Sequence, residues 1–362
     1  MLNTLKTVGE NFCLKGEISS YDLITHGNIN TTYCVHYKNP EKSYIFQRVN
    51  TYVFKEPALI MRNIDLVTEH IRNKKENAPA LHYHHTADRN NYYFGEDGNF
   101  WRVSNNFVSQ TYQSTSDPEV LRQAGKAFGE FQVNLSDFDS KLLHTTIPDF
   151  HNTKKRLKVF FENVEKDEYG RVKEVEKEID FIRSHREIAE KLTNLFEKGK
   201  IPERVTHNDT KINNVLFDKE TGEPLVVIDL DTVMPGLAAH DFGDAVRFAA
   251  NTAVEDEKDL SKVSLDIDLY RGFAEGFISS AGGILTLAEL DSMALGALTI
   301  TIELGLRFLE DYITGDKYFK TRYEGHNLDR ARCQLTLAAD MERKFDIMDK
   351  IVKESAKSFK IH

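Results

Sequence analysis

The residues best suited to chemistry lie in one short stretch, His207-Asn-Asp209 followed by Asn214 and, after a turn, by Asp229. Asp209 opens a polar loop, and Asn214 leads into the apolar run 215–217. A second apolar run, 225–228, ends on Asp229. A hairpin places the end of its second strand beside the start of its first. The pattern therefore predicts that Asn214 and Asp229 lie side by side, with Asp209 nearby.

This set of side chains predicts phosphoryl transfer. Carboxylate and amide oxygens are the ligands that Mg²⁺ prefers, and Mg²⁺ needs few protein ligands when it also binds phosphates. Asn214 and Asp229 can hold the metal, which leaves Asp209 free to accept a hydroxyl proton. Asn and Asp also favour turns, so any one of them alone is better explained as a hairpin residue. The complete set in this spacing favours the functional interpretation.

A second stretch, Asp241-Phe-Gly243, imitates the metal-binding motif of protein kinases. It lies well beyond the strand end that Asp229 already occupies, so we do not assign it to the metal. Asp241 and Asp244 are expected to brace the loop around Asp209 or to cap a helix at 245–252. His207 is expected to shape the same loop through hydrogen bonds rather than to transfer protons.

Around this stretch, the first hundred residues predict a mainly β structure with one helix. Short β-branched and aromatic runs at 21–24, 31–37 and 43–49 are separated by turn residues, and 92–94 and 100–103 flank another turn. Apolar residues at helical spacing predict a helix at 56–73. Residues 105–113 are polar and aromatic and read as a connector.

The rest of the chain predicts helices. Asp117-Pro118 is typical of a helix start, and helical periodicity predicts six helices, at 119–134, 153–165, 174–198, 266–279, 287–312 and 330–355. The β-rich island at 205–231 interrupts them. The predicted organisation is an α+β protein with a β-rich lobe at 1–104, a connector at 105–114 and a larger helical lobe at 115–362.

Composition restricts the function further. The 362 residues carry a formal net charge of −10, which disfavours binding to nucleic acid. The three cysteines lie far apart and predict neither disulfides nor a zinc site. The first residues lack the apolar segment of a signal peptide, and no apolar run approaches the roughly 20 residues that span a bilayer. We therefore expect a cytoplasmic protein with no membrane partner, working as a monomer or a weak dimer.

The stretch around Asp209 resembles the aminoglycoside phosphotransferase and choline kinase superfamily, and further blocks resemble the N-acetylhexosamine 1-kinases within it. These blocks follow one another along nearly the whole chain: Gly27-Asn-Ile-Asn-Thr-Thr-Tyr33, Met61-Arg-Asn63, Trp101-Arg-Val103, Thr206–Asn214, Ile228-Asp-Leu-Asp-Thr232, Asp241-Phe-Gly-Asp244, Arg307-Phe-Leu309 and His326-Asn-Leu328.

The resemblance implies a protein-kinase-like two-lobed fold and the use of ATP and Mg²⁺ to phosphorylate the anomeric hydroxyl of N-acetylglucosamine or N-acetylgalactosamine. Asp209 would be the catalytic base, and Asn214 and Asp229, helped by Asp231, would bind the metal. The implied nucleotide contacts are Gly27, Asn28, Asn30, Thr31, Thr32 and Gln47. The implied substrate contacts are Asn28, Asp209, Arg307 and Tyr312.

Two positions depart from the pattern. Kinases carry a phosphate-binding Lys where this chain reads Gln47-Arg48, and the sugar kinases carry a His where this chain has Asn28. Asn can donate and accept hydrogen bonds but carries no charge. A kinase of another small hydroxyl compound, such as homoserine, choline or an aminoglycoside, therefore remains an alternative. A pseudokinase is the third interpretation, although Asp209, Asn214 and Asp229 are all present.

Overall fold

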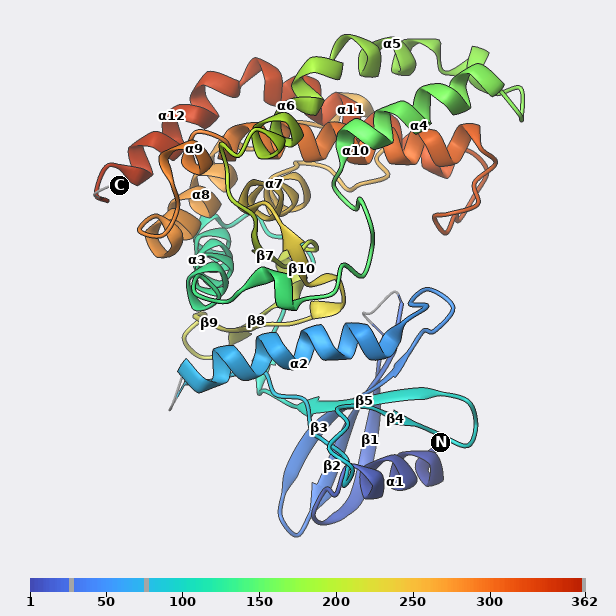
Figure 1. Cartoon of the computed structure of the whole chain (residues 1–362), viewed down its shortest axis with the longest axis vertical. Coiled ribbons are helices and arrows are strands. Elements are labelled where there is room, and N and C mark those ends of the chain that lie inside the picture. The colour runs from blue at the N-terminus through green and yellow to red at the C-terminus, as the bar shows by residue number, and fades with distance from the viewer. Residues whose placement is uncertain (26–28, 75–77, 360–362) are drawn as a thin grey trace.

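The computed structural model describes residues 1–25, 29–74 and 78–359, so the predicted nucleotide contacts Gly27 and Asn28 lie outside the described residues. The chain forms a small part built on a β-sheet and a larger part built mainly of helices (Figure 1). The α+β organisation expected from the sequence is confirmed. The lobe boundaries at 104 and 115 stay a prediction.

The small part is an antiparallel sheet that, within the described residues, has five strands in the order β1-β2-β3-β5-β4. Its strands are β1 (Glu17–Ile24), β2 (Thr31–Lys38), β3 (Lys42–Val49), β4 (Tyr93–Phe94) and β5 (Phe100–Asn105). Helix α1 (Leu2–Asn11) covers it, with Leu5 and Val8 packed in the same apolar cluster as Phe46 and Trp101. The expectation of a single helix in the first hundred residues was therefore wrong.

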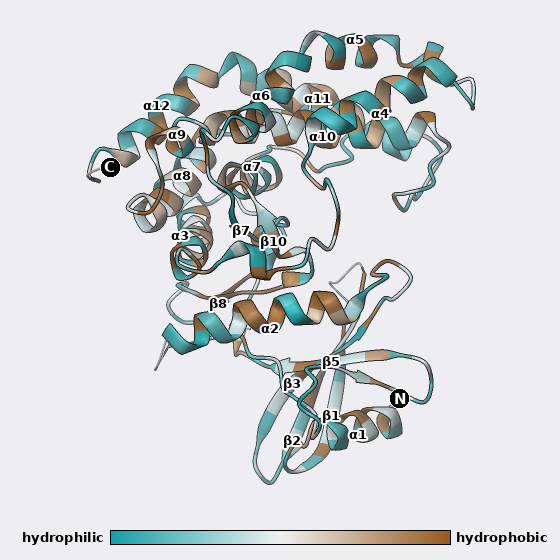
Figure 2. Ribbon diagram, in the orientation of Figure 1, coloured by the Kyte–Doolittle hydropathy of each residue, from teal (hydrophilic) through white to brown (hydrophobic). Residues whose placement is uncertain are grey.

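Helix α2 (Pro57–Lys74) lies between the sheet and the larger part and carries a run of hydrophobic residues (Figure 2). Its Ile60 and Ile64 share one buried cluster with Phe131 and Val205 of the larger part. The Asn63 side chain donates to the backbone oxygens of His144 and Val233 at 2.7 and 3.0 Å and accepts from the His144 N–H at 2.8 Å. These contacts bind α2 firmly to the larger part.

In its described residues the larger part holds two small sheets. Strand β6 (Ser109–Gln110) of the predicted connector pairs with β8 (Val215–Asp218), which pairs with β9 (Pro224–Val227), and β7 (Arg204–Thr206) pairs with β10 (Met234–Gly236). The helices around them are α3 (Pro118–Asn134), α4 (Thr153–Lys166), α5 (Glu176–Ser184), α6 (Arg186–Glu197), α7 (Ala238–Ala249), α8 (Ile267–Ala281), α9 (Leu287–Leu290), α10 (Met293–Ile313), α11 (His326–Arg343) and α12 (Phe345–Ala356).

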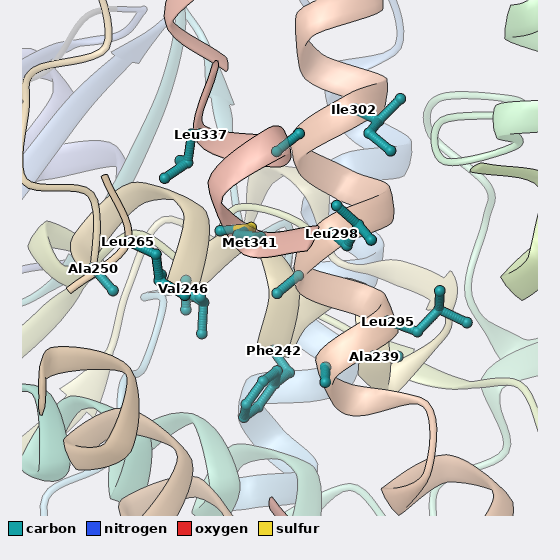
Figure 3. Close-up of a cluster of buried hydrophobic side chains, with 14 of the residues drawn as sticks. Ala239, Phe242, Val246, Ala250, Leu265, Leu295, Leu298, Ile302, Leu337 and Met341 are labelled. Atoms are coloured by element: carbon teal, nitrogen blue, oxygen red, sulfur yellow. The ribbon is translucent and has the colours of Figure 1, made fainter. Parts of the chain in front are cut away.

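The core of the larger part forms where α7, α10 and α11 meet (Figure 3). Phe242 of α7, Leu298 of α10 and Met341 of α11 are fully or almost fully buried there. Glycines let α7 and α10 approach closely, because a Cβ on Gly296 would lie 2.1 Å from the Ala239 oxygen and a Cβ on Gly243 would lie 2.4 Å from the Gly296 oxygen. This close contact fixes α7, which supports the candidate site described below.

Three of the long predicted helices are each broken once. Breaks fall at His185, at Asp291-Ser292 and at Lys344, so that 174–198, 287–312 and 330–355 each contain two helices. None of these positions carries Gly or Pro, the residues that mark helix ends in a sequence. No helix in the described part of the chain is long and apolar enough to cross a membrane.

Candidate functional site

The predicted hairpin forms and brings Asn214 next to Asp229. The chain runs from β7 through a loop containing Asp209 and a single 3₁₀ turn, Ile212–Asn214, into β8. In the β8–β9 pairing Val215 lies opposite Val227, and the Ile228 N–H donates to the backbone oxygen of Asn214 at 2.9 Å. Asp229 follows directly, in a left-handed backbone conformation with φ 62°. The first inference from the sequence is thus confirmed at the level of strand pairing.

The half-buried Asp209 carboxylate is held by two neighbours from its own loop. Lys211 Nζ lies 2.8 Å from Oδ1, and Asn214 Nδ2 lies 3.3 Å from Oδ2 and 2.8 Å from the Asp209 backbone oxygen. Burial lowers the pKa of Lys211, but Asp209 and Asp244 outweigh it, so the pKa is raised and the ammonium stays charged. A carboxylate oriented in this way can accept a proton from a hydroxyl group placed against it.

Helix α7 fixes the backbone of this loop from behind. The buried Asp241 carboxylate accepts from the backbone N–H groups of His207 and Asn208, both at 2.8 Å, and Asp244 accepts from the Thr210 N–H at 3.1 Å. Burial raises the pKa of Asp241 to about 6, although His207 and the two N–H groups act against it. The bracing role predicted for Asp241 and Asp244 agrees with these contacts. The capping alternative was wrong, because both residues lie inside α7.

His207 is fully buried and shapes the loop. Its Nε2 lies 2.9 Å from the Ile228 oxygen, and its Nδ1 accepts from the Asp209 N–H at 3.3 Å. Both ring nitrogens are therefore used in hydrogen bonds within the protein. This agrees with the structural role that the sequence suggested.

The donors beside Asp209 fit a magnesium ion that is shared with phosphates. Asn214 donates its Nδ2 to Asp209, and its Oδ1 accepts no hydrogen bond from the described residues. Burial, and then the charges of Asp231 and Asp209, raise the pKa of Asp229 to about 7, so a cation at this position would relieve the repulsion. No group of three or more His, Cys, Asp or Glu in the described chain could hold a metal. One carboxylate and one amide suit Mg²⁺ when phosphates supply further ligands.

Asp231, the third predicted metal ligand, has a different set of partners. It is 4% exposed, its Oδ1 binds Arg102 Nη1, and its Oδ2 accepts from Asn30 Nδ2 at 2.8 Å. Both partners belong to the small part of the molecule. We therefore leave Asp231 out of the metal set.

The described nucleotide-contact candidates lie at the start of β2 and on β3, but their side chains are divided between the two faces of the sheet. Thr32 pairs with Gln47 and Thr31 pairs with Arg48 in the strand register, so these two pairs point to opposite faces. Gln47 Nε2 donates to Thr32 at 3.1 Å and Gln47 Oε1 accepts from Arg102 Nε at 2.9 Å, while Arg48 donates to Thr31 at 3.3 Å and Asn30 Oδ1 accepts from the Asn50 N–H at 3.0 Å. A nucleotide contact of these residues stays a prediction.

The two substrate candidates on α10 do not lie together. The Arg307 guanidinium lies 5.3, 5.9 and 5.5 Å from the ring centroids of Phe150, Tyr318 and Phe319. Burial and the nearby Arg156 lower its pKa. Tyr312 instead donates its hydroxyl to Glu174 at 2.6 Å and packs against Arg171. Tyr318, which the sequence did not single out, is the tyrosine that faces Arg307.

Two cations beside the carboxylates were also missed. Lys211 lies two residues after Asp209, and this spacing was a usable signal because it allows contact in extended or loop backbone, although it does not require it. Arg102 is 129 positions from Asp231. No local pattern could have joined them.

Comparison with known proteins agrees with this geometry. A family model described as the phosphotransferase enzyme family matches residues 20–270, more than half of the chain. The chain therefore belongs to the phosphotransferase enzyme family, which confirms the coarser part of the resemblance.

Solved structures of low sequence identity share the fold over nearly the whole chain. A microcompartment-associated aminopropanol kinase has a TM-score of 0.62 at 14% identity and covers 96% of this chain and 99% of its own. An aminoglycoside phosphotransferase from Alicyclobacillus acidocaldarius has a TM-score of 0.61 at 13% identity, with 96% of each chain covered. A spectinomycin phosphotransferase, solved with ADP and spectinomycin, has a TM-score of 0.52 at 13% identity and covers 98% and 97%. The fold is thus the kinase-like two-lobed fold.

Proposed function

We propose that this protein is an ATP-dependent kinase that phosphorylates the anomeric hydroxyl of an N-acetylhexosamine, giving the sugar 1-phosphate. The observation that supports a phosphoryl-transfer reaction is the orientation of the Asp209 carboxylate, which Lys211 and Asn214 hold beside Asp229. The choice of a sugar rests on the sequence blocks that resemble N-acetylhexosamine 1-kinases. The family and the ADP-bound spectinomycin phosphotransferase support ATP as the donor.

In the proposed reaction Asp209 orients the acceptor hydroxyl and accepts its proton as the bond to the γ-phosphate forms. An anomeric hydroxyl is more acidic than an ordinary alcohol, so a carboxylate is a sufficient base. Lys211, 2.8 Å from Asp209, places a positive charge where the transferred phosphate carries negative charge. Mg²⁺ held by Asn214 and Asp229 would offset the charge of the ATP phosphates.

The surroundings of Arg307 support an uncharged acceptor. Arg307 is enclosed by aromatic rings, and Arg156 lies close enough to lower its pKa. Arg156 is paired with Glu303 at 3.5 Å, whereas Arg307 has no ion-pair partner among the described residues, so the Arg307 guanidinium would repel a cationic acceptor such as choline or an aminoglycoside. A neutral sugar can pack on the aromatic rings and accept hydrogen bonds from Arg307.

The test measures phosphorylated product from ATP and Mg²⁺ across N-acetylglucosamine, N-acetylgalactosamine, other hexoses, homoserine, choline and an aminoglycoside. We expect turnover with an N-acetylhexosamine and loss of at least about a hundredfold in kcat for Asp209→Asn. Asp88→Asn, an exposed carboxylate of the small part, is the matched control. Turnover only with a cationic acceptor would refute the sugar assignment, and an unchanged rate in Asp209→Asn would refute the mechanism.

A further inference from the structure

The small part lacks a lysine at the position where kinases bind phosphate. In protein kinases that lysine lies on the third strand of the small lobe. By the sequence resemblance this position corresponds to Gln47-Arg48 on β3, and the Gln47 side chain bonds Thr32 and Arg102. In the sheet register Gln47 lies directly opposite Arg102 of β5. The cation that is hydrogen-bonded to Gln47 therefore comes from the neighbouring strand.

Arg102 is almost fully buried, with 1% of its surface exposed. Its Nε donates to Gln47, its Nη1 binds Asp231 and lies 3.7 Å from Met61 Sδ, and its guanidinium lies 5.5 Å from the centroid of the Tyr83 ring. Its Nη2 is buried and has no hydrogen-bond partner among the described residues. A buried donor without a partner is costly and rare, more so on a charged group. A free donor such as Nη2 is expected where an anionic ligand, once bound, accepts the missing hydrogen bond.

The charges around Arg102 place it beside the metal set. Burial disfavours its charged form, but the carboxylates Asp231 and Asp229 stabilise that form, and Asp229 is the carboxylate assigned to Mg²⁺. Asp231, two residues further along the chain, also binds Asn30 at the start of β2. One carboxylate of the larger part thus holds two side chains of the small part next to Asp229.

We propose that Arg102 takes the place of the kinase lysine: Asp231 holds its guanidinium, and Nη2 donates to a phosphate oxygen of bound ATP. Asp231 is then a positioning residue that links the two parts and not a metal ligand. Nη2 has no exposed surface in this structure, so the side chain or the two parts must shift for the contact to form while Nη1 keeps Asp231. This inference rests on the proposed use of ATP.

Calorimetric titration with ATP and with adenosine, both in Mg²⁺, tests the phosphate contact. We expect Arg102→Met to weaken ATP binding by about tenfold to a hundredfold, because a hydrogen bond to a charged group is lost. Adenosine binding is expected to change by less than about twofold. Arg62→Met removes the same charge from the exposed face of α2 and is the matched control. Equal loss for ATP and adenosine, or no loss for ATP, would overturn the proposal.

Two further variants separate positioning from metal binding. Arg102→Lys keeps the charge and is expected to bind ATP with intermediate affinity, and it replaces Arg102→Met if that variant fails to fold. Asp231→Asn is expected to weaken ATP binding in the parent protein but to add nothing in the Arg102→Met background. A further loss in that background, accompanied by weaker Mg²⁺ dependence, would make Asp231 a metal ligand and contradict the positioning role. A parent protein that does not bind ATP would refute the proposed function itself.

Discussion

At the scale of single residues, the site depends on how the polar atoms are divided among their partners. Asn214 gives its N–H groups to Asp209, so its oxygen remains for a metal. Both Asp231 oxygens bind Arg102 and Asn30, and this sets it apart from Asp229 only two residues away. Asp and Asn residues that look equivalent in the sequence therefore differ in their hydrogen-bond partners, and we assign them different roles for that reason.

The sequence motif did not point to Lys211, yet among the residues outside the motif we predict the largest loss of kcat for its substitution. We expect Lys211→Met to lower kcat by about a hundredfold, because a cation beside the transferred phosphate is lost. The measurement is steady-state kinetics with the best acceptor of the panel, at saturating ATP. Lys219→Met, in the exposed turn between β8 and β9, is the control and should leave kcat unchanged. A kcat within about threefold of the parent would show that Lys211 acts only on the loop structure.

At the scale of elements, hydrogen bonds from α7 hold the backbone of the loop that carries Asp209, and close packing against α10 fixes the position of α7. Asp241 and Asp244 bond the loop from one face of α7, while Gly243 and Gly296 bring the two helices together. A change at the helix contact should therefore reach the loop. We therefore expect the packing of these two helices to affect activity.

We predict that Gly296→Ala destabilises the protein by about 1–3 kcal/mol, as is typical of overpacking. The added methyl group would lie 2.1 Å from the Ala239 oxygen, and a backbone atom cannot move away as a flexible side chain could. Urea unfolding measures the loss. The control is Gly283→Ala, because a Cβ on Gly283 meets Phe359 at an ordinary 3.8 Å. Equal stability of both variants would contradict the proposed role of the close contact.

The elements also show what local sequence can and cannot predict. The hairpin of β8 and β9 could be predicted because two apolar runs and the turn between them are contiguous, and their pairing fixes Asn214 beside Asp229. Helix α1 was missed because its 10 residues are short and mostly polar, and only packing on the sheet explains it. At the break His185 makes one contact that no local pattern could predict, since its Nε2 lies 3.2 Å from Glu342 of α11.

At the scale of the whole molecule, the decisive contacts join residues far apart in the chain. Arg102 with Asp231, and Asn63 with His144 and Val233, could not be read from spacing. The net charge of −10 likewise does not describe the surroundings of the predicted site, where Arg102 is almost fully buried and Lys211 lies 2.8 Å from Asp209. Contacts between residues this far apart in the chain can be identified only in the folded structure.

Stability in acid should depend on Glu303 of α10, which holds the segment leading into α4. Burial would raise its pKa, but His151 at 2.9 Å, Arg156 at 3.5 Å and Thr153 at 2.5 Å hold the pKa at about 2. Because the pKa is lowered by folding, the stabilisation is complete above the unfolded pKa of 4.5 and is lost as the pH falls towards 2.

We therefore expect Glu303→Gln to lower the free energy of unfolding by about 3 kcal/mol at pH 7, with the difference shrinking between about pH 4.5 and 2. Denaturant unfolding at several pH values measures this. Glu187→Gln, exposed on α6, should match the parent protein at every pH. A constant difference between Glu303→Gln and the parent across this pH range would contradict the assigned pKa.

Helix α2 belongs to the small part by sequence, yet Asn63 completes backbone hydrogen bonds of the larger part on both sides of the Asp209 loop. Its apolar face is shared with Phe131 and Val205. In an opening motion, we expect α2 to move as one rigid body with the larger part while the sheet swings against it. The hinge would then include the segment between β3 and α2, 50–56, and the Arg102–Asp231 pair would separate in this motion.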